Sequence, residues 1–574
     1  MIGIYKNWNS AIDNEITYVF EILLNAIGIS YVVSSNHKEL IKINPLLIIN
    51  YGDSLPNCLE TTGIIVNIPC SQEFISLRAL FKSNLDKDKT ESYWQEIATL
   101  ENKFLSEILK KITYLDAENL CFDNDILSTR QQGNVTIIDI KFDIIASTFY
   151  LVTCQEQILS LKRDIHDRFL SSYSMLDKLV ETPIVSIYLN FLQQIFLYCA
   201  KRQKEVLVQK WYWPEGRISA VCLTHDVDDI QKWKLWEKGI REIIVGTLKC
   251  KYQWIQNGIL EIYNCLRYED PYWNFEKIVR LEKQYGYLSS FYLLADNSTY
   301  KIRNKKLKNI VKEISQQGFE IGLHASYDSY NRHNQILCEK KRVEEVSGHP
   351  INGIRGHYLR FNPEVTWQVY TEAGFEYDTT VGYADYEGFR TGCSFPLYLY
   401  HIKENKKLPL IELPLIIMDT TLFTYQKYST DEALTNSKRL LEMAKKYNGL
   451  GIILWHQQGF NEKENPGRER IYEEILKWLS ENKIYVRLCQ DIIQWWKRRE
   501  SVRIVKEDKF EYRCISDILI ERDFSFKLSN INLKNLAIEG VKCNLRPLSE
   551  TECMLITKEA TKEFLIKVPK GDSN

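Results

Sequence analysis

The chain has 574 residues, 45% of them hydrophobic and 26% charged, which is typical of an ordered globular protein with two or three domains. Its formal net charge of −1 excludes a general electrostatic attraction to nucleic acid, and no apolar run is long enough to predict a membrane span. The first residues lack the basic and then apolar layout of a signal peptide, and the 14 cysteines form no CxxC pair. We therefore expect a cytoplasmic protein with reduced thiols and no nucleic-acid partner.

The first third of the chain alternates helical and strand-like runs. Residues 11–26 have helical spacing, whereas 31–33 and 63–66 are short apolar runs of the kind found in buried strands. Residues 1–150 are therefore expected to form a small α/β domain, in which no phosphate loop or metal-binding spacing indicates a role. Residues 151–212 have a helical pattern and are expected to connect this domain to the next.

Residues 213–500 repeat strand-like and helical runs in turn. The strand-like runs are 218–224, 289–295, 319–324, 351–357, 408–417, 450–456 and 483–488. The number of such units favours a distorted (β/α) barrel over an open sheet. Residues 501–574 contain short alternating runs instead and are expected to form a small β-rich domain.

Two acids stand at the end of the first strand-like run of this region. Val-Cys-Leu-Thr-His-Asp-Val-Asp occupies 221–228, and Asp226 and Asp228 would point the same way from a strand. Buried carboxylates need a compensating cation, so one acid could hold a metal while the other takes a proton. The alternative is that Asp228 or Asp229 caps the helical stretch that follows. The spacing alone is compatible with both interpretations.

Three histidines stand where other strand-like runs end. Seven of the nine histidines lie between positions 225 and 456, and His324, His357 and His456 each follow such a run. A single histidine in this position is more often structural than a ligand. Three of them together with an acid pair, each at a strand end, are typical of the C-terminal mouth of an α/β barrel.

Four motifs resemble those of the polysaccharide deacetylases of carbohydrate esterase family 4, the NodB homology group, over roughly residues 213–495. They are Thr-His-Asp-Val-Asp at 224–228, His324, Arg355 and Leu-Trp-His at 454–456. Three further segments are similar to a narrower subgroup of bacterial deacetylase-like proteins with an uncharacterised N-terminal domain, which residues 1–210 would form. They are Asp-Pro-Tyr-Trp-Asn-Phe at 270–275, Asp-Thr-Thr at 378–380 and Gly-Phe-Arg at 388–390.

The resemblance implies a metal-dependent hydrolase that removes an acetyl group, an N-acetyl group above all, from a carbohydrate or glycan. It implies a divalent cation, zinc first among them, that polarises the acetyl carbonyl and holds the attacking water. The implied roles are catalytic base for Asp226, metal ligand for Asp228 and His324, positioning of the base for Arg355, tuning of the last histidine for Asp419, and general acid for His456. A backbone N–H at Tyr358 would stabilise the tetrahedral intermediate. Asp419 also lies in an apolar run, where a carboxylate needs a partner.

One position departs from the family pattern. The family usually supplies a second histidine ligand four residues after the first, and here position 328 is Asp. Asp328 is expected to take that place, because carboxylate oxygen is an accepted zinc ligand, and His357 is the competing third ligand. A carboxylate-rich site would also accept other divalent metals. The alternative is a degraded site in a catalytically inactive glycan-binding or scaffold protein.

An unusual insertion, residues 231–268, follows the first strand of the predicted barrel. It is rich in lysine and carries tryptophans at 233, 236 and 254. Such a segment could make a peripheral membrane contact, which would suit a lipid-linked glycan substrate, or could be a solvated helix packed on the barrel. A further alternative concerns the substrate: the family chemistry is also compatible with an amidohydrolase that acts on a non-sugar amide.

Overall fold

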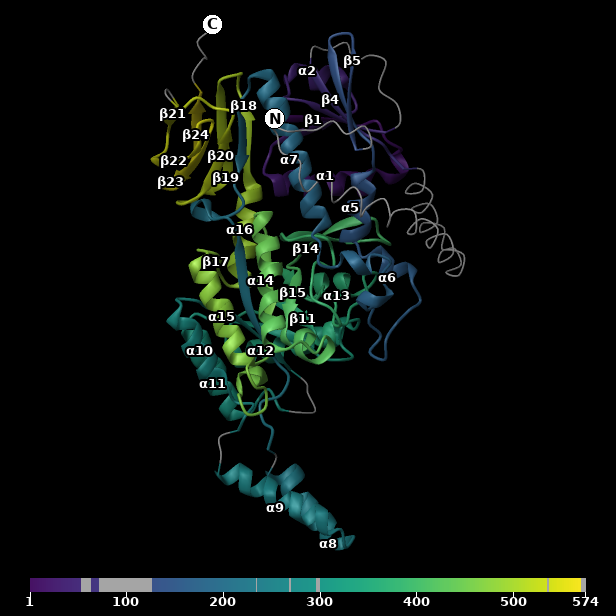
Figure 1. Cartoon of the computed structure of the whole chain (residues 1–574), viewed down its shortest axis with the longest axis vertical. Helices are drawn as coiled ribbons and strands as arrows, with labels where there is room; N and C mark the ends of the chain where they lie inside the picture. The colour runs from purple at the N-terminus through teal and green to yellow at the C-terminus, as the bar shows by residue number, and fades with distance from the viewer. Residues whose placement is uncertain are drawn as a thin grey trace.

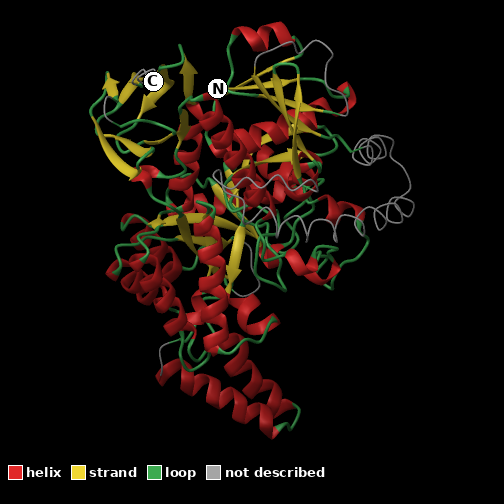
Figure 2. Ribbon diagram, turned by 45° about the horizontal axis from the view of Figure 1, so that its top comes forward, coloured by secondary structure: helices red, strands yellow, loops and turns green. Residues whose placement is uncertain are grey.

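The computed structural model describes residues 1–52, 63–71, 126–233, 235–267, 270–295, 300–533 and 536–568. Figure 1 shows a large central body of strands and helices, with a smaller α/β part and a β-rich part side by side at one end. A pair of helices projects from the opposite end. Figure 2 shows the same pair standing clear of the body from another direction.

A six-stranded sheet forms the N-terminal part. Its order is β2-β1-β3-β4-β6-β5, and every neighbouring pair is parallel except β5 with β6. The strands are β1 (Ile2–Tyr5), β2 (Tyr31–Ser34), β3 (Ile48–Tyr51), β4 (Gly63–Ile68), β5 (Leu127–Gln132) and β6 (Val135–Ile140). The helices α1 (Asp13–Ile27) and α2 (His37–Lys42) connect the first three strands.

Helices join this sheet to the central body. They are α5 (Ile144–Val152), α6 (Gln155–Leu159) and α7 (Ile184–Gln203), of which α5 and α7 pack against α1. The strand β7 (Leu207–Lys210) then pairs antiparallel with β20 (Ser525–Ser529) near the end of the chain. The segment 151–212 was expected to be a helical connector. It differs in supplying a strand to the C-terminal part as well.

The central sheet carries ten strands. The order β14-β12-β11-β10-β9-β8-β16-β15 is parallel throughout, with β13 antiparallel beside β14 and β17 parallel beside β8. The strands are β8 (Ala220–Val227), β9 (Ser290–Leu294), β10 (Glu320–Ala325), β11 (Gly353–Gly356), β12 (Tyr377–Asp378), β13 (Leu397–His401), β14 (Lys406–Glu412), β15 (Leu415–Met418), β16 (Leu450–Leu454) and β17 (Tyr485–Val486). The helices around them are α10 (Phe275–Gln284), α11 (Lys305–Gln316), α12 (His333–Ser347), α13 (Thr366–Glu372), α14 (Thr430–Lys446), α15 (Arg468–Glu481) and α16 (Cys489–Ser501).

This sheet is an open half-barrel, not the closed barrel that the repeat of strands and helices predicts. Among the described strands no ladder joins β15 to β12 or β14. The buried segment 379–396, which has no strand of its own, lies along β15 instead. Gly388 N–H donates to the Ile416 carbonyl, and Leu415 N–H donates to the Val381 carbonyl at 3.3 Å. These bonds satisfy the edge of β15 without a regular ladder.

Aromatic rings fill the interior of the half-barrel, and two glycines make room for them. A Cβ at Gly322 would lie 2.5 Å from the Tyr292 ring, and one at Gly353 would lie 2.0 Å from the Tyr377 ring. The hydroxyls of Tyr292 and Tyr377 hydrogen-bond to each other at 2.9 Å. The centre of the Tyr292 ring lies 4.6 Å from the Arg355 guanidinium. This packed aromatic layer therefore lies directly beneath the residues at the strand ends.

Two four-stranded sheets form the C-terminal part, with the orders β18-β19-β24-β21 and β22-β23-β20-β7. Their other strands are β18 (Val502–Lys506), β19 (Glu511–Ile520), β21 (Ala537–Glu539), β22 (Cys543–Ser549), β23 (Glu552–Thr557) and β24 (Thr561–Lys567). In the sequence, β7 precedes the strands of the central sheet and β18 follows them. The C-terminal part is therefore built from chain segments that come before and after the half-barrel.

Arg499 on α16 connects three parts of the chain at one point. Its side chain is fully buried and donates to the backbone carbonyls of Trp211 at 2.7 Å, Asn25 at 2.6 Å, and Ala26 and Lys210 at 2.9 Å each. These carbonyls belong to the end of α1, to the last residue of β7 and to the residue that follows it. The guanidinium therefore holds the N-terminal part, the connector and the half-barrel together through charge-assisted hydrogen bonds.

We expect Arg499→Ala to lower the free energy of unfolding by about 3 kcal/mol or more, because it leaves three buried carbonyls and one partly buried carbonyl without their donor. Arg499→Lys should restore only part of this, since a single ammonium lacks the planar fork that reaches several acceptors. The matched control is Arg498→Ala, a neighbouring arginine whose surface ion pair with Glu521 is partly exposed. Equal denaturation midpoints for the two alanine variants, followed by tryptophan fluorescence, would contradict this role.

Candidate functional site

The polar residues predicted at strand ends meet at one edge of the central sheet. Asp226 is the penultimate residue of β8 and Asp228 directly follows the strand. His324 lies in β10, and Arg355 lies in β11, two residues before His357. Asp419 comes directly after β15, and His456 comes two residues after β16. Because the carboxyl ends of parallel strands lie at the same edge, segments far apart in the sequence deliver these side chains to one place.

Arg355 and Asp226 form a buried ion pair at the centre of this edge. Arg355 Nη1 lies 2.8 Å from Asp226 Oδ1 and donates to Thr224 Oγ1 at 3.0 Å, while Nε donates to the Thr379 carbonyl at 3.0 Å. Burial alone would lower the pKa of Arg355, but the charge of Asp226 outweighs it and raises that pKa. Asp226 is consequently held in one orientation, with Oδ2 left to face the site.

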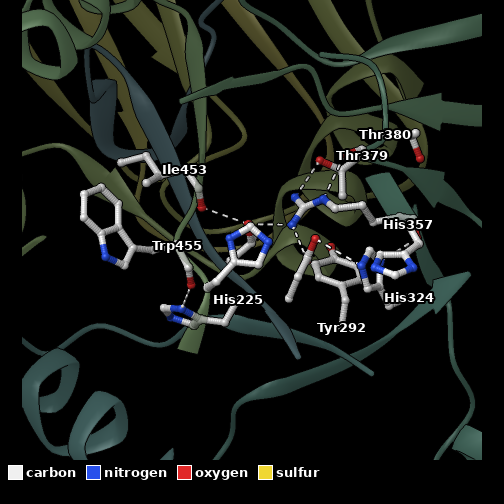
Figure 3. Close-up of polar contacts among 12 residues, drawn as sticks. His225, Tyr292, His324, His357, Thr379, Thr380, Ile453 and Trp455 are labelled. Atoms are coloured by element: carbon white, nitrogen blue, oxygen red, sulfur yellow. Dashed lines mark hydrogen bonds and ion pairs between the residues drawn. The ribbon is translucent and has the colours of Figure 1, made fainter. Parts of the chain in front are cut away.

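Asp228, His324 and His357 bring three potential metal-ligand atoms together. Asp228 Oδ1 lies 3.2 Å from His324 Nε2 and 3.5 Å from His357 Nε2. Tetrahedral zinc with nitrogen and oxygen ligands at 2.0–2.1 Å needs ligand atoms about 3.3 Å apart, so these separations fit such an ion. The ring centres of His324 and His357 lie 4.9 Å apart. Figure 3 shows the two rings side by side.

Hydrogen bonds and neighbouring charges fix the orientation and the pKa values of the groups in this cluster. His324 Nδ1 donates to the Arg355 carbonyl at 3.0 Å, which directs Nε2 at Asp228. Burial would lower the pKa of His324, but Asp226 and Asp228 raise it, so a metal that binds Nε2 would displace a proton from the imidazole. Burial would raise the pKa of Asp228, but the hydrogen bond to His324 and the nearby imidazoles hold it well below its usual range. Burial and the charge of His324 lower the pKa of His357 to about 4, so this imidazole is neutral at pH 7. An ionised carboxylate and a neutral imidazole are the ligand forms that a metal requires.

His456 and Asp419 form a second polar pair on the opposite side of Asp228. His456 Nδ1 lies 2.6 Å from Asp419 Oδ1, which also accepts from Thr420 N–H at 2.9 Å, and Asp419 is buried. His456 Nε2 lies 3.6 Å from Asp228 Oδ2. Burial would lower the pKa of His456, but Asp419, Asp228 and Asp226 raise it to about 10. The imidazole is therefore held as a cation, with one N–H directed into the site.

A cavity of about 470 Å³ is lined by the acids and histidines of the site, namely Asp226, Asp228, His324, His357 and His456. Its lining also includes three tyrosines and a glutamine that the sequence did not single out together: Tyr272, Tyr358, Tyr425 and Gln458. Tyr358 was expected near the reacting centre, and it does line this cavity. Tyr358 and Leu359 both have positive φ angles, 61° and 55°, which non-glycine residues adopt only under constraint. The turn after β11 is therefore a constrained part of the wall.

The structure does not bring Asp328 to the cluster, which corrects the expected ligand set. Its side chain is 69% exposed and lies 3.7 Å from Arg360 Nη1. The physical reason is the path of the loop after β10: Ser326 N–H and Ser329 Oγ both donate to the buried Glu339 carboxylate of α12, each at 3.0 Å. This anchor turns position 328 to the surface, and His357 occupies the third place.

His225 stands beside the acid pair in the sequence but lies outside the site. Side chains alternate along β8, so its ring points to the other face. Its Nδ1 lies 2.6 Å from the Trp455 carbonyl and its Nε2 lies 2.8 Å from Glu282 on α10, and Figure 3 shows the ring next to Trp455 and away from His324. His225 is a structural histidine.

Sequence reasoning missed a loop between α6 and α7 that forms part of the cavity wall. Arg168 lines the cavity, donates to Tyr425 Oη at 2.8 Å and to the Tyr358 carbonyl at 3.3 Å, and is fixed by Asp164 at 2.7 Å. The His166 ring packs on the Tyr358 ring with centres 4.6 Å apart. The only local indication was the charged cluster Arg-Asp-Ile-His-Asp-Arg at 163–168, in a stretch without helical or strand periodicity.

Comparison with known proteins gives one family model that matches a stretch of the chain and distant structural likenesses that each cover about half of it. A family of unknown function, DUF7033, matches residues 5–199, which include the loop of Arg168. No curated protein matches the chain. Among the described residues, no helix has both the length and the apolar character needed to cross a membrane.

Three solved structures illustrate the structural likenesses. A Mycobacterium smegmatis protein assigned as a polysaccharide deacetylase shares 16% identity, with 51% of this chain and 94% of that chain covered and a TM-score of 0.36. The peptidoglycan deacetylase PdaC of Bacillus subtilis shares 12% identity, with 50% and 96% covered and a TM-score of 0.28. A family 4 pseudoenzyme of Bacillus anthracis shares 13% identity, with 48% and 65% covered and a TM-score of 0.26.

The site geometry predicts the ligand set for a divalent metal. We expect Asp228→Ala to weaken zinc binding more than about 100-fold, because Asp228 is the carboxylate that faces both imidazoles. Asp328→Ala should leave zinc affinity unchanged, and Asp328→His should not increase it, since position 328 points to solvent. Isothermal titration of the full chain with zinc measures all three. Loss of binding in Asp328→Ala together with retention in Asp228→Ala would overturn the assignment.

Proposed function

We propose that this protein is a metal-dependent hydrolase that removes an acetyl group, an N-acetyl group above all, from a carbohydrate or glycan intermediate. The observation that carries the proposal is the arrangement of Asp228, His324 and His357 between an Arg355-held carboxylate and a cationic His456, around one cavity. The sequence resemblance to the family 4 deacetylases points to the same chemistry. The proposed metal is zinc, because two imidazoles and one carboxylate leave an open position on a tetrahedral ion.

Asp226 is proposed as the general base. A divalent cation in the cluster would polarise the acetyl carbonyl and lower the pKa of a bound water. Asp226 Oδ1 is occupied by Arg355, and Oδ2 lies 3.6 Å from His324 Nε2, on the side of the cluster. Oδ2 is thus in place to accept the proton of the attacking water, while the guanidinium holds the carboxylate in position.

His456 is proposed as the general acid. The expulsion of an amine from a tetrahedral intermediate needs a proton on the leaving nitrogen. His456 is kept protonated by Asp419, and its Nε2 faces the cavity on the side of Asp228 away from His357. The backbone N–H of Tyr358, in the constrained turn after β11, is proposed to stabilise the oxyanion.

A carbohydrate is the proposed carrier of the acetyl group because of the aromatic residues in the cavity wall. Tyr272, Tyr358 and Tyr425 line the cavity together with polar groups, and Tyr358 and Tyr425 are among the exposed large side chains of the molecule. Aromatic rings offer flat apolar surfaces on which the C–H faces of a sugar ring can pack, and neighbouring polar groups can bond its hydroxyls.

The direct test is acetate release by the zinc- or cobalt-loaded full chain, measured on N-acetylglucosamine oligomers and on N-acetylated non-sugar amides in parallel. Release from the sugars alone supports the proposal, and release from the non-sugar amides alone would move the assignment to an amidohydrolase. A protein that binds the oligomers, binds no metal and releases no acetate would be a glycan-binding module, and the proposed activity would be wrong.

We expect Asp226→Asn to retain zinc affinity within about threefold and to lower kcat by roughly 10²–10⁴-fold. The asparagine carbonyl can still accept from Arg355, but the amide cannot take a proton from water. Titration calorimetry and acetate release on the same preparation separate the two effects. Nearly full activity in Asp226→Asn would show that another group is the base.

The pH dependence should report the His456–Asp419 pair. Because Asp419 raises the pKa of His456 to about 10, the acid stays protonated at neutral pH and is lost only as the pH rises toward that value. Asp419→Asn removes the raising charge, so the alkaline limb of kcat/KM should move to lower pH by roughly one to three units. The matched control is Asp431→Asn, in the first turn of α14. An unshifted alkaline limb in Asp419→Asn would exclude His456 as the acid.

A further inference from the structure

The insertion 231–268 contains a helical hairpin that projects from the body. α8 (Arg241–Leu248) and α9 (Tyr252–Arg267) pack against each other and stand apart from the remaining helices in both views (Figures 1 and 2). Two glycines allow the close packing: a Cβ at Gly258 would lie 2.5 Å from the Gly239 carbonyl oxygen, and one at Gly246 would lie 3.0 Å from Trp254 Cβ. The hairpin is therefore a compact unit that exposes its outer surfaces.

Large apolar side chains cover those outer surfaces. The most exposed are Leu248 at 79%, Leu266 at 77% and Tyr252 at 71%. Others of the same kind are Ile244, Trp254, Ile259, Leu260 and Tyr263. On α9 the positions 252, 259, 263 and 266 repeat at helical spacing and form one stripe, and on α8 positions 244 and 248 do the same. An exposed apolar surface of this extent indicates an interaction site.

The exposed charges on the hairpin are all of one sign. Between residues 238 and 267 the exposed charged side chains are Lys238, Arg241, Lys249, Lys251 and Arg267. The two acids of this stretch are not exposed. Glu242 is half-buried, and Glu261 is buried with its carboxylate 3.1 Å from Lys238 Nζ. Lys249 and Lys251 stand in the turn between the helices, beside Leu248 and Tyr252. The tip thus combines apolar, aromatic and basic side chains.

The base of the hairpin is fixed at the rim of the functional cavity. Asp270 accepts hydrogen bonds from Lys232 N–H at 2.9 Å, Trp233 N–H at 3.1 Å and Tyr272 N–H at 3.0 Å, which ties the outgoing and returning segments together. Asp229 and Tyr272, at the two ends of the insertion, line the cavity. Whatever the hairpin binds is consequently brought to the same side of the molecule as the cavity.

We propose that the hairpin docks on an anionic lipid surface, with its apolar stripe in the headgroup region and its lysines and arginines on the lipid phosphates. Apolar residues flanked by lysines, together with interfacial tyrosine and tryptophan, are the features that hold helices in the plane of a bilayer surface. A second copy of the hairpin is the less favourable occupant, because two surfaces whose exposed charges are all basic repel each other. An anionic surface complements both features at once.

Membrane docking does not depend on the proposed hydrolase activity. If both hold, the cavity faces the lipid surface, and a glycan carried on a lipid anchor is the substrate class that the geometry favours. That consequence rests on the proposed function. Vesicle binding is measured without substrate, so its failure would leave the enzymatic proposal intact.

The test is sedimentation of the full chain with vesicles of phosphatidylcholine alone and of an equal mixture with phosphatidylglycerol. We expect binding to the anionic vesicles only, weakened by added salt. Lys249→Ala with Lys251→Ala should lower the partition coefficient about thirtyfold, since each cation near such a surface contributes about a factor of five. Leu248→Ser with Tyr252→Ser should lower it tenfold or more.

Matched controls use exposed residues elsewhere. Leu519→Ser on β19 and Lys542→Ala before β22 remove side chains of the same kind from the C-terminal part and should leave vesicle binding unchanged. All the substituted side chains are exposed, so zinc affinity and the melting temperature should be retained. Equal binding of all variants, or no binding to either vesicle, would overturn the proposal. A dimer in light scattering that Leu248→Ser with Tyr252→Ser dissolves would instead assign the surface to a second copy.

Discussion

The arrangement of the site depends on the burial of the Arg355 guanidinium. Each of its three nitrogens donates to a protein acceptor, and the acceptors come from the end of β8 and the segment after β12. Its own carbonyl accepts a hydrogen bond from His324 Nδ1–H. A buried charge is tolerated only with such complete pairing, so Asp226 and His324 are fixed by the same requirement that makes Arg355 stable. The proposed base and one proposed ligand are thus set by a single residue.

The meeting of polar residues at strand ends could be predicted from the sequence because the pattern is local. An apolar run that stops at an acid or a histidine locates the carboxyl end of a strand, and parallel strands bring such ends together; Asp226, Asp228, His324 and His456 follow from this argument. The position of Asp328 does not follow from this argument. Its side-chain direction is set by Glu339, which lies outside the motif and binds the loop after β10 to α12. The competing alternative, His357, immediately follows a strand, where local reasoning holds.

Features that depend on contacts between distant segments were not predictable in this way. The strand β7 pairs with β20, and Arg168 meets Tyr358 and Tyr425, across long separations in the sequence. The open edge of the half-barrel is of the same kind, since the irregular segment 379–396 replaces a ladder by scattered hydrogen bonds. Periodicity indicates that a segment is a strand or a helix, but it does not indicate which residues an irregular segment contacts.

The loop that carries Arg168 and His166 makes the cavity of the half-barrel depend on the N-terminal part of the chain. Its side chains lie against Tyr358, one of the two residues with positive φ in the turn after β11, yet they belong to the stretch that the DUF7033 family model matches. A half-barrel joined to a different N-terminal partner would keep Asp228, His324 and His357 but would lose one wall of its cavity. Exchange of these parts by recombination is therefore constrained: a new partner must bring an equivalent of this loop, and residues 164–168 should change in step with 358 and 425 among related chains.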